Sequence, residues 1–479
     1  MLDQYTDFFL VGIKGVAMAN LARILHQLGK WVTGSDSAET FITDPVLAEI
    51  KLTPLIGFSP QDLPPITEVV IYSAAHDGAE NPQVKDAKKR GLLVVHQAAI
   101  LGELIQKYQQ SVAVCGCHGK TTTASLLAYA MINLQVSPGY LVGTSQFSGF
   151  FGGELGKKDY FVLEADEYAL HPPGDRTSKL EHYQPTQILC TNIDYDHPDV
   201  YANLEETKRA FLRFFQKIPL DRVPRLFLCQ DDANLQGVAQ KLPVQSYLTF
   251  GLSDQSDLKI TDVKNDEHET KFKLETSSAK ALRFLPKISR IFSIGLFGEK
   301  NVSNAAGAIL VLLSLGFAEY KIEKAIRLFS GAKRRFEKVE ESDSMTLFDD
   351  YAHHPHEISA TIEAARRRFP HRRLVIIFQP HTFSRTLSLK TEFLEALSHA
   401  DLALIAPIFP SARESYPQPP ITAGDLEELA RKAGKTNVFG YDSNNKLVDA
   451  VSIMHRPGDV IFTMGAGDIY KLKDRLKAV

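Results

Sequence analysis

The sequence predicts an α/β protein of three domains in which most strands are parallel. Its 479 residues are about three times the length of an average domain. Short runs rich in Val, Ile, Leu and Phe alternate with stretches of helical periodicity, the pattern of parallel strands joined by crossover helices. Carboxylates directly follow several of these runs, at the sheet edge where α/β proteins place their ligand sites.

Composition and charge exclude several classes of protein. Hydrophobic residues make up 44% of the chain and charged residues 23%, as in ordinary globular proteins. A formal net charge of −3 provides no positive field for nucleic acid or an anionic membrane surface. No apolar run approaches the roughly 20 residues that span a bilayer, so we expect no membrane insertion. Nothing in the sequence specifies an oligomeric state.

The cysteine content favours a cytoplasmic location. The four cysteines, Cys115, Cys117, Cys190 and Cys229, are too few for a disulfide framework in so long a chain. Cys115 and Cys117 lack the spacing of a zinc knuckle, and no second pair follows them. Reduced thiols of this kind are typical of the cytosol.

The first hundred residues are predicted to form a parallel α/β unit. Strands are expected over 7–13, 31–36, 68–75 and 92–98, and helices over 16–28 and 81–91. The segment GIKGVAM lies at the first strand–helix turn, where phosphates dock on a helix N-terminus. It is only a partial dinucleotide-binding pattern, since Lys14 and Ala17 stand at two of its glycine positions. A plain tight turn is the alternative.

A second unit begins near residue 111 with a pattern for binding phosphate, VCGCHGKTTT. A strand leads into a turn that contains Gly116 and Gly119, and a helix follows. The turn offers backbone N–H groups, Lys120 a cation and Thr121 a hydroxyl, which together suit a triphosphate with Mg²⁺. The commonest phosphate loop has a glycine at the position of Val114, so the match is incomplete. A glycine turn with a surface lysine is the alternative.

Two later strand ends of this unit carry carboxylates. The unit's predicted elements are strands over 111–116, 159–166 and 185–194 and a helix over 121–134. The motifs EADE and TNIDYDHPD contribute Glu164, Asp166, Glu167, Asp194, Asp196 and His197. Oxygen donors at a sheet edge beside a triphosphate suggest ligands for Mg²⁺, although a lone histidine is more often structural. The Thr-, Ser- and Lys-rich stretch 245–294 is expected to be an antiparallel insertion.

A third unit alternates strands and helices after the motif GAKRRFE. Strands are predicted over 345–352, 373–380, 401–409 and 459–467. Two loops after these strands, DDYAHHPHE and FQPHTFSRT, supply Asp350, Tyr351, His353, His354, His381 and Arg385. Such a set could hold a small anionic molecule, with Arg385 as the clamp for a carboxylate. Solvated polar loops are the alternative.

Seven motifs occur in the order found in the Mur ligases of peptidoglycan synthesis, and the chain resembles that family over nearly its whole length. The motifs are GCHGKTTT, EADE, TNIDYDH, NVSNAAGA, GAKRRFE, DDYAHHP and FQPHTFSRT. The resemblance implies a Rossmann-like UDP-sugar-binding domain over 1–110 and a P-loop-type ATPase domain with a mostly parallel sheet over 111–328. A C-terminal Rossmann-like domain that binds the amino acid would occupy 329–479. The family's phosphate loop has the shorter form Gly-x-x-Gly-Lys-Thr. This form needs no glycine at position 114, so Val114 is compatible with it.

The resemblance also implies roles for individual residues. ATP would be bound by Gly116, His118, Gly119, Lys120, Thr121 and Thr122 at its phosphates, by Asn301 and Asn304 at its adenine, and by Arg334, Arg335 and Asp350 elsewhere. Mg²⁺ would be held by Thr121, Glu164 and His197. The sugar nucleotide would contact Gly12, Gly15, Ser73, His76 and Glu167, and the amino acid Tyr351, His381 and Arg385. Lys120 and His197 would stabilise the transferred phosphoryl group, with His353 and His354 as candidate proton acceptors.

The implied reaction couples ATP hydrolysis to the ligation of L-alanine onto UDP-N-acetylmuramate through an acyl phosphate. The third unit most resembles family members that use L-alanine. However, the stretch from Ala169 to Gln184 is longer than in those members and is similar to members that attach a recycled tripeptide. The chain departs from the family at Cys117 (usually threonine), at Lys300 (usually histidine) and at Lys14 and Ala17. The alternative functions are those of a nucleotide-regulated binding module and of a dinucleotide-dependent oxidoreductase.

Overall fold

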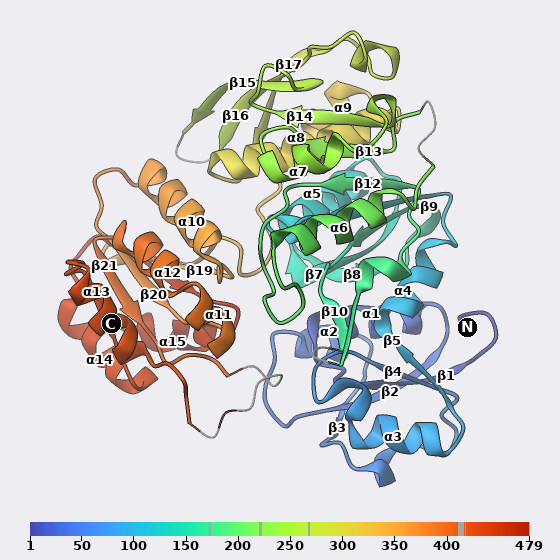
Figure 1. The fold of residues 1–479 in the computed structure, drawn as a ribbon, viewed down its shortest axis with the longest axis horizontal. Coiled ribbons are helices and arrows are strands. Elements are labelled where there is room, and N and C mark those ends of the chain that lie inside the picture. The colour runs from blue at the N-terminus through green and yellow to red at the C-terminus, as the bar shows by residue number, and fades with distance from the viewer. Residues whose placement is uncertain (172–173, 220–222, 267–268, 411–415, 417, 479) are drawn as a thin grey trace. The chain divides into compact units, whose positions relative to one another are not determined.

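The protein has the predicted α/β architecture, built on three main sheets (Figure 1). The computed structural model describes all residues except 172–173, 220–222, 267–268, 411–415, 417 and 479. The chain divides into two compact units, the first formed mainly by residues 1–332 and the second mainly by 333–479. Among the described residues, no helix is both long and apolar enough to cross a bilayer.

The N-terminal sheet has five parallel strands in the order β3-β2-β1-β4-β5, a Rossmann-like arrangement. The strands are β1 (Asp7–Val11), β2 (Trp31–Asp36), β3 (Leu55–Ile56), β4 (Val69–Tyr72) and β5 (Leu93–His96). The helices are α1 (Val16–Gln27), α2 (Asp44–Glu49), α3 (Pro82–Lys89) and α4 (Gln97–Ile105), with 3-10 turns at Pro60–Asp62 and Gly78–Glu80. The glycine turn GIKGVAM, predicted to meet a ligand, follows β1 of this sheet.

The central sheet has ten strands in the order β17-β16-β15-β14-β13-β12-β6-β9-β7-β8. They are β6 (Gln110–Cys115), β7 (Pro138–Phe147), β8 (Phe150–Glu154), β9 (Lys157–Glu164), β12 (Gln187–Cys190), β13 (Leu226–Cys229), β14 (Tyr247–Gly251), β15 (Leu258–Asn265), β16 (Thr270–Thr276) and β17 (Ser289–Ile294). The helices are α5 (Lys120–Asn133), α6 (Leu204–Phe215), α7 (Ala233–Ala239), α8 (Glu299–Ser314) and α9 (Glu319–Ile326), with 3-10 turns at Val244–Ser246 and Ala281–Arg283. β6 lies between β9 and β12 and is parallel to both, so the three strand ends that carry the motifs meet at one edge.

The stretch 245–294 is antiparallel only in part, which corrects the sequence-based expectation of an antiparallel insertion. Its first strand, β14, is parallel to both neighbours, β13 and β15, whereas β16 and β17 form an antiparallel pair. All four strands continue the central sheet. The alternation of polar and apolar residues indicates one exposed face, which is common in antiparallel sheets but also occurs where a parallel strand lies toward the edge of a sheet.

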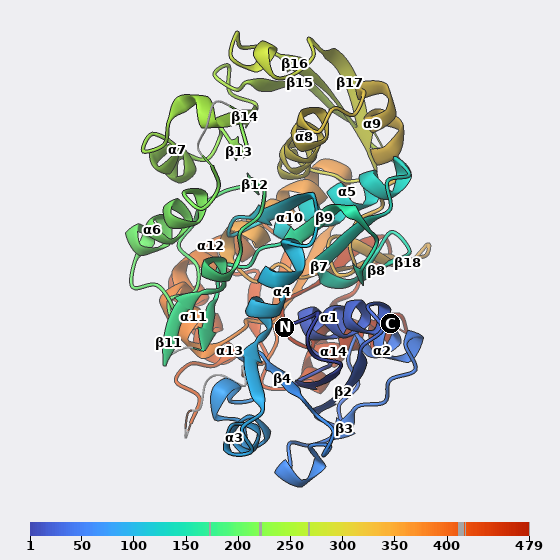
Figure 2. The same cartoon turned by 90° about the vertical axis from the view of Figure 1, so that its right-hand side faces the viewer.

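A small hairpin and a helix contact connect the two sheets of the first unit. β10 (Ala169–His171) and β11 (Asp175–Ser178) pair antiparallel, followed by a 3-10 helix at Lys179–His182. α1 packs against β7 and β8 (Figure 2). The side-chain amide of Asn20 in α1 donates hydrogen bonds to the carbonyls of Val142 (3.0 Å) and Thr144 (2.9 Å).

The C-terminal sheet has six strands in the order β18-β19-β23-β20-β21-β22, and only β18 is antiparallel to its neighbour. The strands are β18 (Glu337–Glu341), β19 (Met345–Asp350), β20 (Leu374–Phe378), β21 (Leu402–Ile405), β22 (Val438–Gly440) and β23 (Asp459–Met464). The helices are α10 (Pro355–Arg368), α11 (Phe383–Ser388), α12 (Lys390–Ser398), α13 (Ala423–Lys432), α14 (Asn444–Met454) and α15 (Lys473–Leu476), with a 3-10 turn at Ile469–Leu472. Separate apolar clusters cover the sheet's two faces, as a doubly wound fold requires.

Candidate functional site

The turn between β6 and α5 is shaped by two glycines with positive φ angles, Gly116 (127°) and Gly119 (82°). A Cβ atom at Gly116 would lie 2.2 Å from the hydroxyl of Thr191, and one at Gly119 would lie 2.8 Å from the amide oxygen of Asn304. Both contacts are too close for any larger residue. Asn304 therefore lies against the turn, and its side-chain amide donates to Asn301 (3.3 Å), so α8 brings both predicted adenine-binding asparagines to this site.

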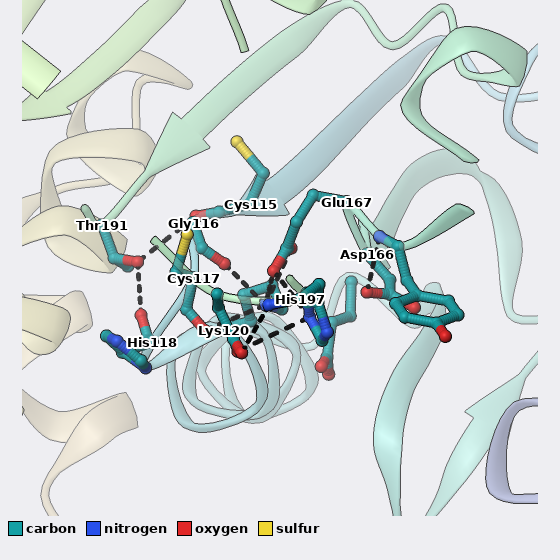
Figure 3. Close-up of polar contacts among 12 residues, drawn as sticks. Cys115, Gly116, Cys117, His118, Lys120, Asp166, Glu167, Thr191 and His197 are labelled. Atoms are coloured by element: carbon teal, nitrogen blue, oxygen red, sulfur yellow. Dashed lines mark hydrogen bonds and ion pairs between the residues drawn. The ribbon is translucent and has the colours of Figure 1, made fainter. Parts of the chain in front are cut away.

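Lys120 points back over the turn into a cluster of polar groups (Figure 3). Its Nζ donates to the carbonyls of Gly116 (2.6 Å) and Cys117 (3.1 Å) and to both carboxylate oxygens of Glu167 (2.9 and 3.1 Å). Burial lowers the pKa of Lys120, but Glu167 and Asp166 outweigh this and raise it above its ordinary value. The lysine is thus a permanent cation at the helix N-terminus, where a phosphate could replace the carboxylate.

The loop after β12 holds the rest of the turn in place. The carbonyl of His118 accepts from the Thr191 hydroxyl (2.6 Å) and the Asn192 amide (2.8 Å), and the His118 ring lies 3.0 Å from Asp194. Cys117, which replaces the family's threonine, is buried and its thiol donates to the carbonyl of Asp194 (3.2 Å). The cysteine therefore retains a hydrogen bond from its side chain to this loop.

Two hydroxyl-bearing residues begin α5. The hydroxyl of Thr121 donates to Glu164 (2.8 Å), and Thr122 is buried beside it. Glu164 is the last residue of β9, so β9 and α5 meet at the edge where the metal was predicted. A Cβ atom at Gly143 on β7 would lie 2.5 Å from the Glu164 carboxylate, so this glycine makes room for the side chain.

A second cluster of metal-binding groups lies next to Lys120. Side-chain donor atoms of Asp166, Glu167 and His197 lie within 4.8 Å of one another. His197 has a φ of 59°, uncommon outside glycine, and its Nε2 lies 3.5 Å from both Glu167 and Asp196. Two carboxylates with one imidazole form a donor set that suits Mg²⁺ or Mn²⁺.

This cluster shares His197 with the residues that the resemblance assigns to the metal, namely Thr121, Glu164 and His197. Glu167, which the resemblance assigned to the sugar nucleotide, lies with Asp166 and His197, and all three were among the carboxylates and imidazoles that the strand-end motifs suggested for Mg²⁺. Burial raises the pKa of Glu167, but Lys120 and His197 outweigh this effect and hold it below its ordinary value. The carboxylate is therefore ionised and able to bind a cation. The EADE motif contained the signal, but spacing alone could not assign its three carboxylates to different partners.

The first glycine turn, between β1 and α1, brings together the residues predicted to bind the sugar nucleotide. Gly12 has a φ of 76°, and a Cβ atom there would lie 3.0 Å from the ring of His76. Gly15 directly precedes α1, which has no side-chain cap on its first N–H groups. Ser73 follows β4, and its hydroxyl accepts from the N–H of Ala75 (3.4 Å). The helix N-terminus and His76 thus face the same turn.

Lys14 has a structural position in this turn. Its Nζ donates to the carbonyls of Ser37 (3.0 Å) and Glu39 (2.7 Å), and its backbone N–H donates to Asp36 (2.7 Å). Burial raises the pKa of Asp36, but hydrogen bonds from His76 and from two backbone N–H groups outweigh it and lower the pKa. Asp36 is consequently an ionised carboxylate at the end of β2.

The second unit gathers the residues predicted to bind the amino acid at the ends of β19 and β20. The ring of His353 lies 5.3 Å from that of Tyr351 and 6.3 Å from that of His381, which stacks on Phe409. Nδ1 of His353 lies 3.3 Å from Glu357, which can orient the imidazole. Arg385 follows in α11 and is 6% exposed.

The two arginines of GAKRRFE have different environments. The guanidinium of Arg334 donates to Asp349 (3.1 Å) and to the carbonyls of Gly465 (2.5 Å) and Gly467 (3.2 Å). These contacts favour a structural role for Arg334. Arg335 lies over the ring of Tyr351 at 4.9 Å, which keeps it near the predicted acceptor pocket.

Asp350 and His354 are both buried at the start of this loop region. Burial raises the pKa of Asp350 to about 6, against the opposing effects of Arg335 and the N–H groups of Ala352 and Phe336. His354 caps α10, where its Nδ1 accepts from the N–H of His356 (3.4 Å). Capping favours a structural role for His354 and leaves His353 as the stronger candidate for proton transfer.

Comparison with known proteins gives the class of the chain. Three family models match in order: "Mur ligase family, catalytic domain" over residues 8–109, "Mur ligase middle domain" over 114–312, and "Mur ligase, glutamate ligase domain" over 334–467. The UDP-N-acetylmuramate–L-alanine ligase of Desulfitobacterium hafniense is 34% identical, covering 97% of this chain and 98% of its own. That of Pediococcus pentosaceus is also 34% identical and covers 100% of both chains.

Solved structures give the same fold. A UDP-N-acetylmuramate-alanine ligase from Thermotoga maritima is similar with a TM-score of 0.78, 22% identity and 99% coverage of both chains. A murein peptide ligase from Psychrobacter arcticus has a TM-score of 0.74 and 22% identity, covering 99% of this chain and 98% of its own. The chain belongs to the Mur ligase family, which confirms the resemblance seen in its motifs.

Proposed function

We propose that the protein is an ATP-dependent ligase that joins L-alanine to UDP-N-acetylmuramate, giving UDP-N-acetylmuramoyl-L-alanine, ADP and phosphate for peptidoglycan synthesis. The observation that carries the proposal is the β6–α5 turn, whose Lys120 meets Glu167 beside His197. Full-length similarity to relatives named for this reaction supports the choice of substrates. The reaction belongs in the cytoplasm, where ATP and nucleotide sugars are found.

The proposed first step transfers the γ-phosphoryl group of ATP to the lactyl carboxylate of the sugar nucleotide. A free carboxylate is a poor electrophile because it would have to expel oxide, whereas an acyl phosphate expels phosphate. Phosphoryl transfer needs mainly positioning and charge neutralisation. Lys120 leaves Glu167 and binds the outer phosphate oxygens, while the N–H groups at the start of α5 surround the phosphates.

We assign the metal to Thr121, Glu164 and His197, with Glu167 beside the imidazole. These residues fit Mg²⁺ because they offer hard oxygens, one imidazole and a hydroxyl at the same sheet edge. When bound, Mg²⁺ would neutralise charge that develops on the phosphates. Glu164 accepts from the Thr121 hydroxyl and thereby orients it toward that edge.

The second step is attack of the neutral amine of L-alanine on the acyl phosphate. The proposed acceptor residues are Tyr351, His353, His381 and Arg385 in the second unit. Arg385 pairs with the amino acid's carboxylate, and His353, oriented by Glu357, accepts the proton released as the amide forms.

The long stretch from Ala169 to Gln184 favours one alternative. This alternative is ligation of a recycled L-alanyl-γ-D-glutamyl-diaminopimelate tripeptide to the same sugar nucleotide. The hairpin β10–β11 occupies this stretch, and one structural neighbour is a murein peptide ligase. The residues at the ends of β19 and β20 favour a free amino acid, because a buried Arg385 suits a compact carboxylate.

One experiment tests the proposed function and its alternative. The enzyme is incubated with Mg-ATP and UDP-N-acetylmuramate plus L-alanine, L-serine, glycine or the tripeptide, and products are identified by mass. We expect phosphate release only with both acceptor and sugar nucleotide, and the highest kcat/KM with L-alanine. A preference for the tripeptide would contradict L-alanine as the acceptor. An absence of acceptor-dependent phosphate release would contradict ligase activity.

A further inference from the structure

The loop that joins β20 to α11 contains a residue with a strained backbone, Thr382. Its φ of 71° and ψ of 141° lie in a region that is populated almost only by glycine. For a β-branched residue such a positive φ is a genuine outlier, because the Cβ atom crowds the neighbouring peptide groups. Strain of this kind persists only where surrounding contacts hold the residue in place, and it is found most often at functional sites.

The chain before Thr382 is held by the loop after β21. The N–H of Thr382 donates to the carbonyl of Phe409 (3.1 Å), and the N–H of Phe409 donates to the carbonyl of Pro380 (2.8 Å). These two bonds pair His381 with Phe409 as in a parallel ladder. The two rings also stack, with centroids 5.5 Å apart and planes 13° apart. The backbone and the ring of His381 are therefore both fixed.

Gln379, which precedes this pair, is anchored to the end of β23. Its N–H donates to the carbonyl of Met464 (2.8 Å). Its side-chain amide donates to Asp468 (2.8 Å) and accepts from the N–H of Ile469 (3.1 Å). The residue is buried, so these bonds are shielded from water. The strain at Thr382 is therefore not relieved by movement of the segment that precedes it.

The chain after Thr382 is held by α11, which Thr382 caps. Its hydroxyl accepts from the N–H of Arg385 (3.3 Å), and its carbonyl accepts from the N–H (3.2 Å) and the hydroxyl (2.6 Å) of Thr386. The capping bond thus ends on the backbone of the arginine that is assigned to the acceptor carboxylate. Glycine would adopt this φ without strain, but it has no hydroxyl with which to hold Arg385.

Thr422 shows that capping alone requires no strain. It caps α13 in the same unit with a φ of −123°, and its hydroxyl accepts from the N–H of Asp425 (3.2 Å). Thr422 is exposed, and α13 carries none of the residues assigned to the acceptor. The positive φ of Thr382 is therefore set by the direction that the chain takes from His381 to Arg385.

We propose that Thr382 is a positioning residue of the acceptor site. Its strained backbone turns the chain so that His381 and Arg385 both reach the acceptor, and its hydroxyl holds the backbone of Arg385 in place. The inference rests on the proposed function, which assigns these two side chains to the acceptor amino acid. The protein thus gives up stability at one residue to keep the acceptor-binding loop in a single conformation.

Thermal unfolding of the full-length protein tests the strain without any substrate. Thr382→Gly removes the crowded Cβ atom, which offsets the lost hydroxyl bond, so we expect a melting temperature at or above that of the parent. Thr422→Gly is the matched control, because it loses the same kind of bond with no strain to relieve, and it should melt about 2 °C or more below the parent. Thr382→Val keeps the β-branched shape without the hydroxyl and should also melt below the parent.

Steady-state kinetics test the positioning role. KM is measured for whichever acceptor the parent uses best, so the result does not depend on L-alanine being that acceptor. In Thr382→Gly and Thr382→Val we expect this KM to rise about fivefold, while kcat and the KM values for ATP and the sugar nucleotide stay within about twofold. Thr382→Ser retains the hydroxyl and should keep the parental KM. Thr422→Gly should keep all kinetic constants of the parent.

The two readouts separate a positioning role from a merely structural one. A structural threonine would lose stability and acceptor affinity together, whereas we expect Thr382→Gly to keep its stability and lose acceptor affinity. A melting temperature for Thr382→Gly as far below the parent as that of Thr422→Gly would overturn the strain. A parental acceptor KM in both Thr382→Gly and Thr382→Val would overturn the positioning role. Failure of the proposed function is a separate result, an absence of acceptor-dependent phosphate release by the parent, and the melting comparison is decided in either case.

Discussion

The turns after β1 and β6 are built alike, yet their lysines have different partners. Each turn joins a parallel strand to a helix and contains a glycine with positive φ, Gly12 at 76° and Gly119 at 82°. Lys14 donates to the backbone carbonyls of Ser37 and Glu39. Lys120 donates to two carbonyls and to the carboxylate of Glu167.

The difference lies in whether the partner can be exchanged. Backbone carbonyls between β2 and α2 are fixed by the fold, so a ligand cannot replace them without unfolding that segment. A carboxylate is an anion, and a phosphate is a better one for a lysine at a helix N-terminus. One strand–turn–helix pattern thus gives a structural lysine in the first domain and a candidate phosphate-binding lysine in the second.

Exchanging the two lysines for uncharged residues should separate these roles, and this is the largest effect we expect. Lys120→Ala should lower kcat by about 10²-fold or more, because the transferred phosphoryl group loses a preorganised cation. Its fold, measured by circular dichroism, should be retained. Lys14→Met should keep most of kcat and lose stability instead, by about 1–3 kcal/mol, since two buried carbonyls lose their donor. Near-parental turnover by a folded Lys120→Ala would reject the assignment of this turn.

The metal site sharpens the comparison, because a group of three carboxylate and imidazole side chains lies beside the second turn, whereas the first turn has the single pair Asp36 and His76. That statement covers the described residues. Glu164→Gln should raise the Mg²⁺ concentration for half-maximal activity by about 10- to 100-fold. Glu167→Gln should raise it less, since Glu167 pairs with Lys120, and His197→Ala should resemble Glu164→Gln. If all three variants keep the parent's Mg²⁺ dependence, the metal lies elsewhere.

Binding of the acceptor amino acid should depend on Arg385, which lies in neither of the two turns. Arg385→Lys keeps the charge but loses the planar pair of donors that matches a carboxylate. We expect KM for L-alanine to rise about tenfold, with KM for ATP and for UDP-N-acetylmuramate unchanged. Parallel changes in all three KM values would show that Arg385 supports the fold of the second unit and does not bind the acceptor.

The last effect concerns Asp350 and the pH dependence of stability, and it leaves both turns unchanged. Burial raises its pKa to about 6, so the folded protein binds a proton there more tightly than the unfolded chain does. This contribution favours folding at low pH and is lost as pH rises from about 4 to 6. Relative to Asp350→Asn, the parent should lose about 2–3 kcal/mol of unfolding free energy over that range. Denaturant titrations at pH 4 and 7 check this, and a difference between the two proteins that is independent of pH would contradict it.

The fold class was predictable because its signals are local. Alternating apolar runs and helical periods lie within 10 to 20 residues of sequence, and β2 and α5 fall within one residue of their predicted bounds. β7 and β8 were missed because glycines weaken a strand pattern. Those glycines are explained by close contacts: a Cβ at Gly152 would lie 1.9 Å from the carbonyl of Thr144, and one at Gly143 would meet Glu164.

The candidate site was predictable as a set of residues and less so as a set of contacts. Glu164 and Glu167 lie three positions apart, yet one meets Thr121 and the other Lys120 and His197. Arg334 carries the family's motif, but its partners lie more than a hundred residues along the chain at Gly465 and Gly467. Contacts of this kind depend on strand order and side-chain direction, which periodicity does not report.

The most direct test of the central claim is nucleotide binding by the two lysine variants. Isothermal titration with Mg-ADP is carried out on the parent, Lys120→Met and Lys14→Met, each first shown to be folded. We predict that the parent and Lys14→Met bind with similar affinity and that Lys120→Met binds at least about tenfold more weakly. Equal affinity for the parent and Lys120→Met, or a loss confined to Lys14→Met, would contradict the account.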